Sequence, residues 1–138
     1  MSPDGRYRTL LANDGQVYVQ DTCIGTRGEC VPSTTIASVA DDGTPANFYC
    51  NFSWITANGR FLLFSTDASN LVPNDTNGND SGGEDMFVHD TCIGAVGVCT
   101  PQTVRISLAA DGSQAEQPLD PYVVISADGS YAAFAGQA

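Results

Sequence analysis

Basic residues are scarce in this chain of 138 residues. Five Lys and Arg stand against 16 Asp and Glu, which gives a formal net charge of −11. A surface of that sign repels a nucleic-acid phosphate backbone, and the sequence holds no basic stripe that would overcome the repulsion. The same charge disfavours anionic membranes. Nucleic acid is therefore not an expected partner, and the acidity favours either solubility or divalent-cation binding.

Long apolar runs are also missing. No segment approaches the roughly 20 apolar residues of a transmembrane helix, so no membrane insertion is expected. Residues 1–5 have neither a basic region nor an apolar core, and we do not expect them to be a signal peptide. Charged residues make up only 15% of the chain, and Gly, Pro, Asp, Asn, Ser and Thr fill the gap. This mixture predicts an all-β fold of short strands joined by turns.

The cysteines indicate an oxidising compartment. Four of the five form two pairs with the same spacing, Cys23 with Cys30 and Cys92 with Cys99. Each pair encloses six residues with two glycines, which is enough flexibility to fold back, so two local disulfides are predicted. Zinc is the alternative, although this spacing is not that of the usual short knuckle. Cys50 is left over, as a buried thiol or an intermolecular partner.

Internal repetition is the strongest signal in the sequence. The motif Asp-Thr-Cys-Ile-Gly at 21–25 recurs at 90–94. A second motif, of the type Ser-Pro-Asp-Gly-Arg-Tyr, occurs three times. Each copy places Asp-Gly or Asn-Gly between apolar runs, which predicts a hairpin through a type I′ turn with positive φ at both central residues. The repeats are assigned as a first at 1–55, a second with the insertion at 56–125, and the start of a third at 126–138.

Each repeat predicts about four short antiparallel strands. The two hairpin strands are nearly continuous in apolar character, so both of their faces should be covered. One four-stranded sheet cannot cover two apolar faces by itself, whereas like sheets stacked around an axis can, and that arrangement is a β-propeller. Strands are expected at 52–55 and 61–64, around the second hairpin motif, and then at 85–89 and 102–108, and the last two have counterparts at 16–20 and 33–39.

The hairpin motif, with a strand on each side, resembles the WD40-like (PD40) repeat of TolB-type bacterial propellers. The stretch from Ile55 through Asp90 is similar to a subgroup of secreted bacterial propeller repeats. This resemblance covers nearly the whole chain. It implies a closed ring of several blades, of which a chain of this length makes about two. We therefore expect a partial propeller continued by further blades of a longer chain, a ring completed by oligomerisation, or an unusual open form. The resemblance also implies binding or scaffolding in the cell envelope or outside the cell, and no common reaction.

The second repeat carries an Asp-, Asn- and Gly-rich insertion at 74–85 that the first lacks. Oxygen ligands at alternate positions of such a loop suit calcium, which takes six to eight of them. The alternative is a solvated loop of turn-forming residues. No other cofactor is expected. The candidate metal ligands are Asp75, Asn77, Asn79 and Asp85, with Asp80 or Glu84 in reserve.

No catalytic motif stands out. The sequence contains no Gly-x-Ser-x-Gly elbow, phosphate loop or metalloprotease motif. His89 is the only histidine, and without a nucleophile motif beside it we interpret it as structural rather than as a general base. The aromatic residues of the central hairpin are interpreted as core rather than as a glycan-stacking platform: Phe52, Trp54, Phe61 and Phe64.

These features predict a non-catalytic binding or scaffold module that is secreted, periplasmic or on the cell surface. Its expected partners are itself or further blades, together with a protein or glycan ligand. The alternative is part of a propeller enzyme, a hydrolase or lyase acting on glycans or peptides, with its catalytic residues elsewhere.

Overall fold

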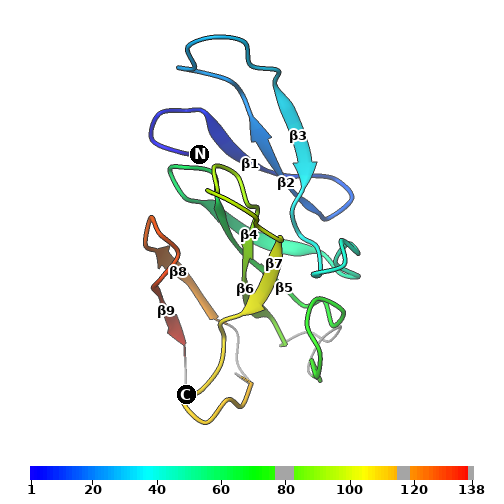
Figure 1. The fold of residues 1–138 in the computed structure, drawn as a ribbon. Helices are drawn as coiled ribbons and strands as arrows, with labels where there is room; N and C mark the ends of the chain where they lie inside the picture. Colours follow the sequence, from blue (N-terminus) through cyan, green and yellow to red (C-terminus); the bar gives the residue numbers. More distant parts are fainter. Residues whose placement is uncertain (77–82, 115–118, 137–138) are drawn as a thin grey trace.

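The computed structural model describes residues 1–76, 83–114 and 119–136, and every regular element in these ranges is a β-strand (Figure 1). The strands form three antiparallel sheets, which confirms the all-β prediction. Within the described residues, no helix could span a membrane. In sheet order, the strands are β1(Tyr7–Leu11), β2(Val17–Asp21) and β3(Ser33–Ile36); β4(Cys50–Ile55), β5(Phe61–Thr66), β6(Asp85–Asp90) and β7(Gln102–Arg105); and β8(Leu119–Ile125) and β9(Ala132–Gly136).

The sequence repeat reappears in the pairing of the strands. β1 and β5 both begin with the aromatic residue that ends the hairpin motif, and β2 and β6 both end with the aspartate of Asp-Thr-Cys. The antiparallel register brings these residues opposite each other, Tyr7 with Asp21 and Phe61 with Asp90. Two stretches with the same residue pattern thus adopt the same strand arrangement. The sequence-assigned boundaries after 55 and 125 fall at the ends of β4 and β8.

The type I′ turn predicted for the hairpins is wrong. The backbone of Asp4 does not have a positive φ, whereas Gly5 has a φ of 76°. The amide of Gly5 donates to the carbonyl of Ser2 at 3.0 Å, so glycine is the fourth residue of the turn. The reason is local: the carboxylate of Asp4 accepts the Arg6 amide at 3.0 Å, and this side-chain bond replaces a left-handed backbone at the aspartate. The turns at Gly59 and Gly129 are built in the same way.

The central sheet is covered on both faces, and this explains its continuous apolar strands. On one face Leu62, Phe64 and Phe87, all with an exposed fraction of 0%, pack in one cluster with Val17 and Val19 of the first sheet. The rings of Phe64 and Phe87 stack with centroids 5.6 Å apart. Burying each such side chain stabilises the fold by about 1.5–3 kcal/mol.

The opposite face of the central sheet packs on the third sheet. Leu63, Met86 and Val88 form a cluster with Val123 of β8, which is 6% exposed. Neighbouring residues of β5 therefore point into two different cores, because side chains alternate across a strand. The three sheets follow one another along the chain, and each contacts the next (Figure 1).

The outer strands β3 and β7 end earlier than the sequence predicts. After each of them the chain forms a second tight turn, closed by the amide of Ala40 on the carbonyl of Thr44 and by the amide of Ala109 on the carbonyl of Ser113, at 2.8 and 2.9 Å. These turns hold another copy of Asp-Gly, which favours a reversal over a longer strand. The predicted strands at 33–39 and 102–108 therefore each contain a strand of four residues and the start of a loop.

Candidate functional site

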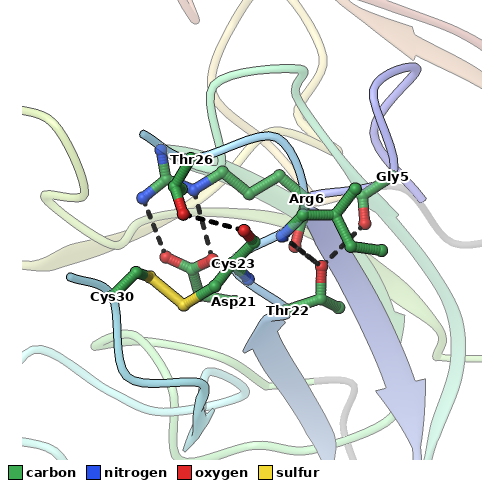
Figure 2. The surroundings of a disulfide bond; sticks show 8 residues. Gly5, Arg6, Asp21, Thr22, Cys23, Thr26 and Cys30 are labelled. Carbon is green, nitrogen blue, oxygen red and sulfur yellow. Dashed lines mark hydrogen bonds and ion pairs between the residues drawn. A yellow bond between two sulfur atoms is a disulfide. The ribbon is translucent and has the colours of Figure 1, made fainter. Parts of the chain in front are cut away.

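Each cysteine loop is tied to the hairpin turn of its own sheet (Figure 2). In the first sheet, Arg6 Nε and Nη2 donate to the two carboxylate oxygens of Asp21 at 3.2 and 3.0 Å. Asp21 also accepts the amide of Cys23 at 2.9 Å, and the Thr22 hydroxyl bonds the carbonyl of Gly5 at 3.0 Å. The guanidinium holds the pKa of Asp21 below its usual value. The loop is therefore fixed by charge-assisted bonds as well as by its disulfide.

The second sheet repeats this arrangement bond for bond. The residues in the matching roles are Arg60, Asp90, Thr91, Cys92 and Gly59. Both disulfides have a Cα–Cα distance of 5.8 Å, so the predicted pairs Cys23–Cys30 and Cys92–Cys99 are confirmed. Asp21 and Asp90 lie beside the sulfur atoms, but oxidised cysteines offer no thiolate to zinc. Two disulfides are typical of proteins from an oxidising, extracellular environment.

Cys50 is the one cysteine outside these loops. Its thiol is free, and the residue is 4% exposed at the start of β4. Burial raises the pKa of the Cys50 thiol, because the thiolate would lose its hydration. Of the two roles that the sequence left open, the structure favours the buried thiol, since a residue this covered cannot reach a partner chain without local opening.

The insertion between β5 and β6 brings two of the proposed calcium ligands to one basic residue. Arg105 Nη1 lies 3.4 Å from a carboxylate oxygen of Asp75 and 3.4 Å from one of Asp85. The Asp75 and Asp85 side chains are 0% and 1% exposed. Ser107 donates a further bond to Asp85. Burial raises the pKa of Asp85, while the guanidinium and the Ser107 hydroxyl act against that rise.

The guanidinium supplies the positive charge that a cation would otherwise bring to these two carboxylates. Asn77, Asn79 and Asp80 lie outside the described residues. Glu84, the other reserve ligand, accepts hydrogen bonds from Ser65 and Asn51 at 2.6 and 3.2 Å. Calcium binding stays a prediction for this loop.

A pocket of about 410 Å³ lies between the first and second sheets. Strands β2 and β3 and the loop that follows them form one wall, and β6 with the second cysteine loop forms the other. The pocket therefore exists only because the two sheets stack. Its lining combines an apolar floor with hydroxyl and carboxylate groups, chiefly Val19, Ile36, Thr35, Asp41, Asp42 and His89.

His89 is the buried histidine of this pocket, with an exposed fraction of 4%. Its Nδ1 lies 2.8 Å from the hydroxyl oxygen of Thr103. That hydroxyl donates its only proton to the carbonyl of Val39 in the loop after β3, so it must accept from His89. The network thus assigns the proton of neutral His89 to Nδ1 and leaves Nε2 as an acceptor.

Burial favours the neutral state of His89, and a second hydrogen bond holds Thr103 in position. Burial lowers the pKa of His89, because the imidazolium would lose hydration, although the carboxylates of Asp90 and Asp41 act against the shift. Asp41 also accepts the backbone amide of Thr103 at 2.7 Å. The bonds of Thr103 to Val39 and Asp41 therefore join the loop after β3 to the central sheet directly beside the pocket.

Sequence reasoning treated His89 as isolated and missed this pocket. A signal for it was present, because the repeat aligns His89 with Gln20 and Thr103 with Thr34. Gln20 and Thr34 form the matching side-chain bond, at 3.3 Å, on an exposed face of the first sheet. The repeated pair thus predicts a cross-strand hydrogen bond, but only the stacking of the sheets converts one copy into a buried network.

The aromatic residues of the central hairpin divide between the core and the surface. Phe64 is 0% exposed, and Phe52 and Phe61 pack against the second core cluster, as interpreted from the sequence. Trp54 differs, since 47% of it is exposed. It lines a shallow groove between β4 and β8 together with Tyr122.

No family model matches this chain, and neither a curated protein nor a solved structure matches it. The resemblance to TolB-type repeats therefore stays a prediction from the sequence motifs.

Proposed function

We propose that this chain is a non-catalytic binding and scaffold module of the cell envelope or exterior, built from β-propeller repeats. In such a ring β4 to β7 form one four-stranded blade, and β1 to β3 and β8 with β9 belong to the blades on either side. Support comes from the two apolar clusters that join successive sheets. The two disulfides support an extracytoplasmic location.

The observation that carries the binding role is the pocket between the first two sheets. Its volume of about 410 Å³ falls within the roughly 300–1,000 Å³ of small-ligand sites. An apolar floor with a few convergent polar groups is also the usual composition of such sites. The carboxylate oxygens of Asp41 and Asp42 and the Nε2 of neutral His89 act as hydrogen-bond acceptors. The pocket therefore favours a ligand rich in donors, such as a sugar unit of a glycan or a polar peptide side chain.

Two neighbouring threonines of β3 test this role. Thr35 lines the pocket, whereas Thr34 lies on the opposite face of the strand and bonds Gln20. We expect oligosaccharide and peptide arrays to identify a ligand of the wild-type chain that is bound without turnover. Calorimetry should then show at least about tenfold weaker binding for Thr35→Trp, because the indole fills the pocket, and unchanged binding for Thr34→Trp. Failure of both arrays, or equal losses in the two variants, would contradict the proposal.

A further inference from the structure

The hairpin turns make the same contact from one sheet to the next. A Cβ added to Gly59 would lie 2.6 Å from Cγ of Tyr7, and one added to Gly129 would lie 2.7 Å from ring atoms of Phe61. Each turn thus places a glycine directly against the aromatic ring of the preceding sheet. Tyr7 and Phe61 hold the same position, as the first residues of β1 and β5. The ring-on-glycine contact is therefore a repeated element of the interface between sheets.

At each end of the stack of sheets, one half of this contact is left without the other half: the ring of Tyr131 at one end and Gly5 at the other. Tyr131 follows the third turn as Tyr7 and Phe61 follow the first two, yet 79% of it is exposed. At the other end, a Cβ on Gly5 would meet only the Cδ1 of Ile24, at 3.9 Å. Tyr7 by contrast is 6% exposed, because the Gly59 turn covers it. A bare ring at one end of the stack thus corresponds to an open glycine at the other.

The surface around Tyr131 is apolar as well. Tyr122 and Val124 of β8 are 82% and 63% exposed, while Val123 between them is buried against the central sheet. Over residues 122–124, β8 is therefore apolar on both faces and covered on only one. The central strand β5 has the same two-sided character and is covered on both faces by stacked sheets. Exposed apolar area of this kind marks an interaction surface.

We propose that the open face of β8 and β9 binds the β1–β3 sheet of a second copy of this chain, with Tyr131 on the Gly5 turn. This contact continues the interface that already occurs twice within the molecule. It joins two different surfaces, so it is head-to-tail, and successive copies extend the stack into a ring or an open filament. It does not involve the pocket, and it adds self-assembly to the proposed binding role.

Sedimentation equilibrium of the 138-residue chain tests this contact with two variants, one for each surface. Tyr131→Ser removes the ring. Gly5→Asn fills the space over the turn, and asparagine tolerates the left-handed backbone that Gly5 adopts at a φ of 76°. The wild type should exceed the 14.4 kDa of one chain in a concentration-dependent way. Each variant should raise the dissociation constant at least about tenfold, the effect of losing a buried aromatic anchor.

Mixing the two variants gives the sharper result. Gly5→Asn keeps an intact Tyr131 and Tyr131→Ser keeps an intact Gly5, so an equimolar mixture should form dimers and nothing larger. Val98→Ser, on the fully exposed tip of the second cysteine loop, is the control and should associate like the wild type. Circular dichroism confirms that each variant is folded. A wild type that stays at the mass of one chain, variants that associate normally, or a mixture that stays monomeric would each overturn the proposal.

Discussion

Replacing Arg105 by methionine should lower the unfolding free energy by about 3–5 kcal/mol at neutral pH, the cost of leaving buried carboxylates without their countercharge. Arg105 lies 3.4 Å from a carboxylate oxygen of both Asp75 and Asp85, and all three side chains are nearly inaccessible. Methionine keeps much of the side-chain volume, so the charge is the main loss. Urea unfolding monitored by circular dichroism measures the change.

The pH dependence distinguishes lost charge from lost packing. Burial raises the pKa of Asp85 in the native state, so the native state binds its proton more tightly than the unfolded chain does. Stability from this group is therefore greatest at low pH and falls as the pH rises through the raised pKa. Without the guanidinium the pKa rises further, and the deficit of the variant should be small near pH 4 and largest near pH 7.

The control is Arg60→Met at the partly exposed pair with Asp90, where the side chains are 33% and 22% exposed. A solvent-screened pair of this kind contributes far less than a buried one, so only a small loss is expected. Equal losses for Arg60→Met and Arg105→Met, or a deficit for Arg105→Met that does not change between acid and neutral pH, would contradict the buried-charge account.

Replacing Gly59 by alanine should cost about 2–5 kcal/mol. Its φ of 75° places it in the left-handed region, which costs a residue with a Cβ about 1–2 kcal/mol. The new Cβ would also lie 2.6 Å from Cγ of Tyr7, and overpacking of this kind adds about 1–3 kcal/mol. The contact joins the first two sheets, so thermal unfolding should begin at a clearly lower temperature.

Gly112 separates the two causes. Its φ is 83°, and a Cβ there would meet nothing within 4 Å, so Gly112→Ala should cost only the backbone share of about 1–2 kcal/mol. In a Tyr7→Ala background, Gly59→Ala should fall to the same cost, because the clashing ring is gone. Additive losses for Tyr7→Ala and Gly59→Ala would show that the ring and the turn do not interact.

The fold could be predicted from the sequence wherever a motif occurs more than once. The two cysteine loops and the hairpins around Gly59 and Gly129 repeat short patterns, and local chemistry is enough to specify them. The predicted turn type is wrong because the carboxylate of Asp4 accepts the backbone amide of Arg6. The Asp-Gly dipeptide alone does not show whether the aspartate will form this side-chain bond or adopt a positive φ. The outer strands β3 and β7 are shorter than predicted for a similar reason, because a second Asp-Gly turn ends each of them.

The candidate site could be predicted only in part, because it depends on contacts between sheets. The insertion suggested oxygen ligands at Asp75 and Asp85, but nothing near them in the sequence indicated Arg105, which arrives from β7. In the same way, His89 gains its buried environment from Thr103 and from Val39, which lies in the loop after β3. Residues far apart in sequence acquire their ionisation and hydrogen bonding from packing, and a single sequence does not contain that information.

Proton nuclear Overhauser measurements on the Tyr7 and Phe61 rings test the repeated stacking most directly. If equivalent sheets stack through ring-on-glycine contacts, the Tyr7 ring protons should show cross-peaks to the α-protons of Gly59, and the Phe61 ring protons to those of Gly129. Both pairs of α-protons should also shift upfield in the ring currents, and those of Gly5 should not do so in dilute, monomeric protein. Absence of both sets of cross-peaks in the folded chain would contradict the account.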